Sequence, residues 1–595
     1  MKHRSTAIVI AFLPILSALN SLKAESSNIV IEVEATRIRP VTTPDSTPLQ
    51  HIPGVTLRRQ GRGNPQTDLS IRGSSFSSAG LTIGGLSLRN AQTEHWHASI
   101  STPASWLEQP SVVTGLDRFR LSTGHPAGSV ALSLAPLLSD ENRITIGGGN
   151  YGTIFGGAEL TRVEHLEEST IGTSAFISYN HSDQTDSTGG NYLDRITTGG
   201  RISRISDKTQ ADLLATISRS EFGAQGFYGA SSKYPAEEEL VDSMVLGSLK
   251  FTEDPDAPAS LSAAWRQTDD TYILNRYKPL IYRNEHTTDF FALHGDKRTI
   301  ISESLSIDTR TDAELETIRS ESLGDHDRSR SSLALIPNWR VGDITFSAGD
   351  SAEFFSSDST CFLPAAGVEW EFREDHTLFI NYTESLRQPS YTELNYESPD
   401  SLGNTGLERQ HTLTTETGYK GNTESSSWKL TLFYERTTET VDWVKSASGS
   451  RWSAVNLDET ESFGAEALAA TEISSSTELS GSILLLKKDI SGNYYAGRYA
   501  LDYPQFSGDI TVKEQITSDL MLALTQVISK YEFNPVREGD DWLTDTTINI
   551  QWLLPFAEKL TLNAGICNIF DDEFQFYPGQ DSLGRSVYSS LTYSW

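Results

Sequence analysis

Hydrophobic and polar residues alternate with a period of two over the last ten positions of the chain, ending on an aromatic residue. One face of this segment consists of Val587, Leu591, Tyr593 and Trp595. The opposite face consists mainly of Ser586, Ser590, Thr592 and Ser594. A strand with this pattern is typical of a barrel that has lipid outside and polar groups inside. Pairing with the first strand would leave no open sheet edge.

Alternating segments of the same kind recur from residue 142 onward, separated by polar loops. Examples are 171–179, 378–382, 428–434, 548–554 and 560–566. None of these segments has a sustained helical period. Roughly 450 residues, at about 20 per strand and connection, correspond to about 22 strands. The pattern therefore predicts an all-β transmembrane barrel of about 22 antiparallel strands. The lumen of so wide a barrel must be plugged or left open.

The first 135 residues differ from the rest in composition and in hydrophobic pattern. Residues 1–24 join a basic start to an apolar run shorter than the ~20 residues of a spanning helix, which predicts a signal peptide. The alternative is a single membrane anchor. Residues 25–50 are interpreted as an extended arm, and 51–135, rich in Gly and Ser with short strand-like pieces, as a small compact domain. Residues 136–595 would form the barrel.

Charge and motif content narrow the function classes. The net charge of −31 argues against a nucleic-acid partner, which requires clustered Lys and Arg. It is compatible with acidic external loops that hold cations, although ordinary solvated carboxylates explain most of these charges. The sequence contains no Gly-x-Ser-x-Gly, no phosphate-binding loop and no His-Glu-x-x-His. We therefore predict that the chain is not an enzyme.

Four short motifs occur in a fixed order along the chain. The first combines Ile-Pro-Gly-Val at 52–55, Ile-Arg-Gly at 71–73 and Leu-Thr-Ile-Gly-Gly at 81–85. The others are Leu-Arg-Gln-Pro-Ser at 386–390, Phe-Gly-Ala-Glu at 463–466 and Asn-Ile-Phe-Asp-Asp at 568–572. With these motifs, the chain resembles the TonB-dependent outer-membrane receptors.

This resemblance implies a small α/β plug inside the barrel and a place in the outer membrane of a Gram-negative cell. It also implies a short strand that pairs with the periplasmic energy-transducing protein TonB. The segment that fits this role is Ile29, Val30, Ile31, Glu32 and Val33. The alternative is an ordinary first strand of the plug. Residues 121–132 keep only a trace of the usual end of the plug, so the plug looks trimmed.

Two groups of residues are candidates for contact with a large nutrient. His95, Trp96 and His97 lie in the plug region and resemble a stretch of some cobalamin-like receptors of the family. Two His side chains on one face would also suit a transition metal. Flat aromatic side chains in external loops suit macrocyclic ligands, and the candidates are Phe227, Tyr228, Tyr277 and Tyr282. Packing inside the plug and an aromatic belt at the membrane interface are the respective alternatives.

An acidic loop between two predicted strands is a candidate calcium site. Its carboxylates are Asp183, Asp186 and Asp194, and calcium would need further oxygen ligands from other loops. Solvated loop acids are the alternative. No cofactor is required by this interpretation beyond a possible structural calcium.

Three functions remain open at this stage. The first is a monomeric, TonB-coupled importer of a scarce large nutrient, with a corrinoid slightly preferred to a ferric siderophore. The second is a passive porin-like or adhesin-like barrel with a vestigial plug. The third is a secreted β protein such as a propeller, which would need a repeating unit that the sequence lacks.

Overall fold

The computed structural model describes residues 49, 52–61, 65–95, 99–183, 191–229, 234–356, 360–492, 494–580 and 584–595. The signal peptide and the strand Ile29–Val33 expected from the sequence lie outside these residues. So do Trp96, His97 and Asp186. Within the described residues, no helix is long and apolar enough to cross a membrane.

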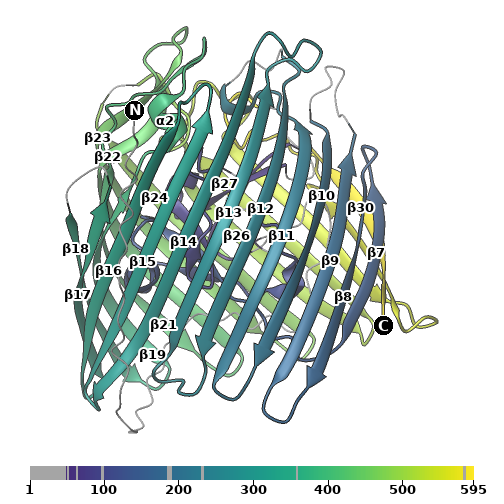
Figure 1. Ribbon diagram of the computed structural model, residues 1–595, viewed down its shortest axis with the longest axis vertical. Helices are drawn as coiled ribbons and strands as arrows, with labels where there is room; N and C mark the ends of the chain where they lie inside the picture. Colours follow the sequence, from purple (N-terminus) through teal and green to yellow (C-terminus); the bar gives the residue numbers. More distant parts are fainter. Residues whose placement is uncertain are drawn as a thin grey trace, which may run out of the picture.

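Long antiparallel strands form one closed barrel (Figure 1). Among the described residues there are 22 of them, because the two-residue strands β20 (Ser401–Leu402) and β25 (Ala496–Gly497) belong to loops. The expected strand number and fold class are therefore confirmed. The strands are β7 (Glu141–Gly149), β8 (Ile154–His165), β9 (Thr170–Ser182), β10 (Leu193–Ile205), β11 (Thr209–Gly223), β12 (Glu237–Phe251), β13 (Ala259–Ile273), β14 (Arg283–Ser302), β15 (Leu305–Ser320), β16 (His326–Val341), β17 (Ile344–Phe355), β18 (Cys361–Arg373), β19 (His376–Arg387), β21 (Gln410–Asn422), β22 (Ser426–Lys445), β23 (Trp452–Glu472), β24 (Thr477–Ile490), β26 (Pro504–Thr517), β27 (Leu520–Tyr531), β28 (Trp542–Leu553), β29 (Leu560–Cys567) and β30 (Ser586–Ser594).

The terminal strand closes the barrel in the manner that its alternation predicts. β30 pairs antiparallel with β7, and Leu591 lies opposite Ile146. These two side chains point outward and are 40% and 65% exposed, whereas Ser590 points inward and is 3% exposed. Apolar side chains therefore face lipid and polar ones face the lumen.

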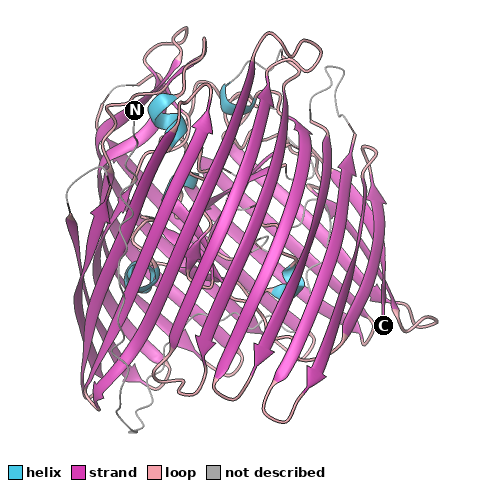
Figure 2. Ribbon diagram, viewed as in Figure 1, coloured by secondary structure: helices cyan, strands magenta, loops and turns pink. Residues whose placement is uncertain are grey.

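Short turns lie at the end of the barrel where the chain terminates, and longer loops lie at the opposite end (Figure 2). In barrels of this kind the short turns are periplasmic and the long loops external. One long loop carries α2 (Tyr391–Asn395), which begins with a capping box between Ser390 and Glu393. Another carries the turn η3 (Phe227–Gly229). The α2 end of the barrel is therefore the external end.

A small α/β domain occupies the lumen, as Figure 1 shows in purple. β1 (Val55–Gln60) pairs with β2 (Gln66–Ile71), and a second sheet has the order β4-β3-β6-β5. The elements of that sheet are β3 (Ala79–Ile83), β4 (Leu86–Ser87), β5 (Ser111–Val113) and β6 (Gly128–Leu132). The domain also contains the helix α1 (Gly115–Leu121) and two short turns, η1 (Phe76–Ser78) and η2 (Ala104–Trp106).

The apolar core of this domain extends onto the barrel wall. Leu81, Ile83 and Trp106 are buried together with Phe176 and Leu246 of the barrel. The indole N–H of Trp106 donates to Ser174 Oγ at 2.9 Å. We call this domain the plug, because it is packed against the inside of the barrel by apolar and polar contacts alike.

Candidate functional site at the plug–barrel interface

Arg72 of the plug joins two of the sequence motifs. It follows β2 in a left-handed turn with φ of 53°, and Gly73 continues the turn with φ of 67°. A Cβ atom at Gly73 would lie 2.6 Å from Leu486 of the wall, so glycine is needed there. The turn directs the Arg72 guanidinium at Glu466, the last residue of the 463–466 motif, with Nη2 and Oε2 3.0 Å apart.

A second carboxylate completes this contact. Arg72 Nη1 lies 2.8 Å from Glu416 Oε2 on β21, and all three side chains are buried. Burial lowers the pKa of Arg72, but the attraction of Glu466 and Glu416 raises it overall, so the arginine stays charged. Removing one member of such a buried ion pair leaves an unpaired charge, which is strongly destabilising. We call Arg72, Glu416 and Glu466 the arginine lock.

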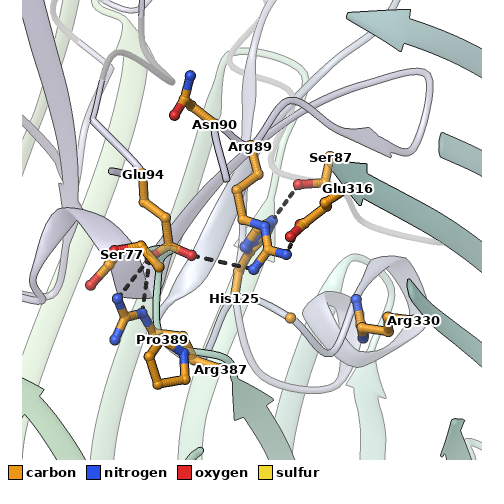
Figure 3. Close-up of polar contacts among 12 residues, drawn as sticks. Ser77, Ser87, Arg89, Asn90, Glu94, His125, Glu316, Arg330, Arg387 and Pro389 are labelled. Atoms are coloured by element: carbon orange, nitrogen blue, oxygen red, sulfur yellow. Dashed lines mark hydrogen bonds and ion pairs between the residues drawn. The ribbon is translucent and has the colours of Figure 1, made fainter. Parts of the chain in front are cut away.

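A second network lies nearer the external end and is drawn in Figure 3. Glu94 of the plug accepts hydrogen bonds from Arg387 at the end of β19, with Nη2 to Oε2 at 2.8 Å. Arg387 also contacts Glu393 of α2 at 2.7 Å. Burial raises the pKa of Glu94, against the opposing effect of Arg387 and Arg89.

The network continues around the wall through Arg89. Its Nη1 lies 3.3 Å from Glu94 Oε1, and its other terminal nitrogen is paired with Glu316 of β15 (Figure 3). Glu316 is paired in turn with Arg328 of β16. Positive and negative groups therefore alternate from α2 through the plug to β15 and β16, which fixes the plug apex to the wall.

An aromatic cluster joins the plug to two external loops. His95 stacks on Phe76 with ring centroids 3.9 Å apart, and its Nδ1 lies 2.7 Å from Asp68 Oδ2. Tyr499, from the loop after β25, packs edge-on against Phe76. Tyr577, from the loop before β30, donates its hydroxyl hydrogen bond to Asp68. The external loops therefore contact the plug apex directly.

The aromatic candidates Phe227, Tyr228 and Tyr282 belong to one apolar cluster, and His95 adjoins it through Tyr228. His95 and Tyr228 lie close together, with ring centroids 5.6 Å apart, and both His95 nitrogens have partners, because Tyr499 Oη is 3.4 Å from Nε2. Phe227 is buried against Phe222.

The other two aromatic candidates differ in their surroundings, because Tyr282 packs against the cluster that contains Phe227 and Tyr277 does not. Tyr277 is 68% exposed, and Arg276 lies over its ring. Tyr282 donates to the hydroxyl of Tyr396 at 3.2 Å. Their role in ligand contact stays a prediction, as does that of His95, Phe227 and Tyr228.

Two of the predicted calcium ligands flank one histidine. His181 Nδ1 lies 2.9 Å from Asp194, and its Nε2 lies 3.3 Å from Asp183. Among the described residues, no group of three or more His, Cys, Asp or Glu side chains has the arrangement of a metal site. Calcium at this loop stays a prediction.

A cavity of about 450 Å³ lies at the short-turn end of the barrel. Its wall comes from strands β23, β24 and β26 to β29 and their short turns, and includes Glu478, Lys513, Met521 and Gln551. Lys513 and Glu478 are direct partners on adjacent strands and form an ion pair in this wall at 2.8 Å. None of its lining residues belongs to the described part of the plug, and the trimmed plug expected from residues 121–132 stays a prediction.

Known proteins place this architecture in a family. A model described as "TonB dependent receptor-like, beta-barrel" matches residues 139–552. The chain belongs to this family. The expectations of an outer-membrane location and of a receptor rather than an enzyme are therefore confirmed.

A curated relative matches only part of the chain. The iron-regulated outer membrane virulence protein of Vibrio cholerae is 25% identical over 196 residues, which are 30% of this chain and 29% of that protein. The match thus spans less than a third of the relative's length.

Solved structures of similar fold cover most of the chain. The FrpB iron transporter from Neisseria meningitidis has a TM-score of 0.70 and 11% identity, over 91% of this chain and 95% of that one. A ferric enterobactin receptor mutant from Pseudomonas aeruginosa, in complex with enterobactin, has a TM-score of 0.72 and 14% identity, over 91% and 96%. At 11% and 14% sequence identity, this similarity shows a shared fold alone.

The sequence motifs contain two members of the arginine lock, Arg72 and Glu466, but not Glu416. Arg72 and Glu466 stand in two separate motifs, and only the fold brings them together. The available signal was a charged residue at an apparent core position in each motif, since such charges need a partner. Arg387 likewise stands in the motif at 386–390, and only the fold brings it to Glu94.

Proposed function

We propose that the chain is an active importer that binds a ferric siderophore or a similar large nutrient at its external end. Transport would be driven by TonB through the segment Ile29–Val33. The observation that carries this proposal is the plug. Apart from the chain connection to β7, it is held in the lumen by non-covalent contacts, among them buried ion pairs. Such a plug blocks diffusion and can still move when pulled.

The choice of ligand class rests on the relatives. The names of the V. cholerae relative and of two structural neighbours refer to iron or to enterobactin. Together they favour a ferric siderophore over the corrinoid slightly preferred from the sequence. The Tyr-rich external loops supply flat apolar surfaces with polar tips, which suit a large chelate.

The proposed coupling is tested by deleting 29–34 in cells that depend on this receptor for labelled ferric siderophore. The matched control deletes 41–46, an equally long piece of the same arm. We expect the first deletion to abolish uptake but not ligand binding, and the second to change neither. Uptake that survives the first deletion would contradict coupling and favour the passive barrel.

The ligand itself is tested by quenching of tryptophan fluorescence in the purified receptor. Ferric catecholate, ferric hydroxamate, haem and cobalamin are compared. Tight binding of a ferric siderophore alone supports the proposal, whereas preferential binding of cobalamin or haem refutes the siderophore assignment.

A further inference from the structure

Two carboxyl groups face each other between the plug apex and the barrel wall near its external end. Glu238 lies at the start of β12 and Asp270 near the end of β13, and they are 1% and 3% exposed. Glu238 lies opposite Tyr272 and Asp270 lies opposite Leu240, so the two carboxyl groups are diagonal neighbours on the buried face of the β12–β13 pair. We call Glu238 and Asp270 the carboxyl pair.

The carboxyl pair lacks the positive partner that the other buried carboxylates at this interface have. Glu416 and Glu466 share Arg72, Glu94 is paired with Arg387, and Glu353 is paired with Arg330. Among the described residues, no Lys or Arg compensates Glu238 or Asp270. Two buried negative charges without compensation are very costly, so a positive species is expected between them.

Hydrogen-bond donors are also too few around the carboxyl pair. Gln92 Nε2 of the plug donates to Asp270 Oδ2 at 2.6 Å. The single hydroxyl proton of Tyr228 faces both Gln66 Oε1 at 2.7 Å and Glu238 Oε2 at 2.9 Å. It can serve only one of these acceptors at a time.

Three further polar atoms at this place have no partner among the described residues. They are Asp270 Oδ1, Gln92 Oε1 and the Tyr272 hydroxyl oxygen. Gln92 is 3% exposed, and its carboxamide is already fixed against Asp270 by its other end. Tyr272 lies directly opposite Glu238 in the β12–β13 register. Buried polar atoms are rarely left without partners, so these oxygens point to a missing ligand.

We propose that a hard divalent cation of the calcium type binds between Glu238, Asp270 and Gln92. Carboxylate, carboxamide and hydroxyl oxygens are the ligands that calcium takes, and two carboxylates match its charge. Tyr228 and Tyr272 supply the neighbouring hydroxyl oxygens. The cation would join the plug apex to β12 and β13, in addition to Arg266 of β13, which donates to the Leu88 carbonyl of the plug. This site is separate from the loop that holds Asp183 and Asp194, and it does not rest on the proposed function.

The test uses the full-length receptor, purified in detergent and treated with a chelator. Calcium chloride is titrated calorimetrically at neutral pH, with magnesium chloride as the second probe. We expect one calcium per chain and a higher thermal unfolding midpoint in its presence. The isosteric double variant Glu238→Gln/Asp270→Asn should lose both effects. The matched control Glu239→Gln/Asp269→Asn, which removes two carboxylates from the opposite, outward face of the same two strands, should keep both.

Several outcomes would overturn the inference. Calcium binding that is equal in the wild type and in Glu238→Gln/Asp270→Asn would place the cation elsewhere. Absence of binding in the wild type, together with an infrared band of a protonated carboxyl that the double variant loses, would show a shared proton instead. The heat-modifiable mobility of the folded barrel shows whether each variant is folded, so loss of folding is not mistaken for loss of binding.

Discussion

Single buried charges explain how the plug is held. A motif arginine such as Arg72 has no reason to be buried unless carboxylates meet it, and Glu416 and Glu466 do so from strands far away in sequence. The sequence could identify Arg72 as part of a plug motif. The sequence could not identify the partners of Arg72, because they are determined by the position of the plug in the lumen and not by a local pattern.

Arg72→Met should loosen the plug without preventing barrel formation. It leaves two buried carboxylates without their cation, which costs about 3–5 kcal/mol of plug docking. We expect faster proteolysis of the plug and increased entry of large antibiotics. The control Arg436→Met removes one member of an exposed pair with Glu459. It should behave as wild type, and a similar effect of the two variants would contradict the lock.

Tyr577 should make stability depend on alkaline pH. Burial and the charge of Asp68 raise the pKa of Tyr577 well above its usual 10. A raised pKa means that the folded state keeps the proton more tightly. The stabilisation is thus complete below about pH 10, and it is lost as the pH rises through the pKa that Tyr577 has in the folded state.

The Tyr577→Phe variant measures this contribution. We expect it to lose about 1.5–3 kcal/mol, typical of a hydrogen bond to a charged group. The difference in thermal unfolding midpoint from wild type should be constant from about pH 6 to about pH 9 and shrink at higher pH. Tyr495→Phe, at a more exposed external tyrosine, is the control. A difference independent of pH above 10 would refute the assignment.

At the scale of elements, alternation predicted the strands well and missed the helices. The terminal segment has the faces expected of it, because lipid and lumen impose opposite polarity on successive residues. α1 and α2 have seven and five residues, too short to show a helical period. They are defined instead by contacts, such as the capping box of Ser390 and Glu393.

Ile146→Arg should test the lipid face of β7. Ile146 is outward-facing and opposite Leu591, so the arginine would enter the membrane. The expected cost is about 2–4 kcal/mol if the position is near the midplane. It is measured by urea unfolding of the receptor refolded into lipid vesicles. Thr145→Arg, one residue away and on the lumen face, should cost clearly less, and equal costs would contradict the assigned faces.

At the scale of the whole molecule, strand number followed from length, but loop placement did not. About 22 strands could be predicted because strand and connection lengths are set by the membrane. The folding of the Tyr499 and Tyr577 loops onto the plug depends on contacts across hundreds of residues. The external end is thus closed by long-range packing that no local pattern records.

The proposed import requires the plug apex to separate from the wall, and a reversible crosslink tests this. The backbone N–H of Thr392 in α2 donates to the carbonyl of Gln92 at 2.8 Å, which brings the two residues within disulfide reach. We expect oxidised Gln92→Cys/Thr392→Cys, with Cys361 and Cys567 replaced by Ser, to bind ferric siderophore but not transport it. Reduction of the same protein should restore uptake, and the single-cysteine variants should be insensitive to oxidant. Full uptake in the crosslinked state would mean that the apex stays docked and that the ligand passes on another side of the plug.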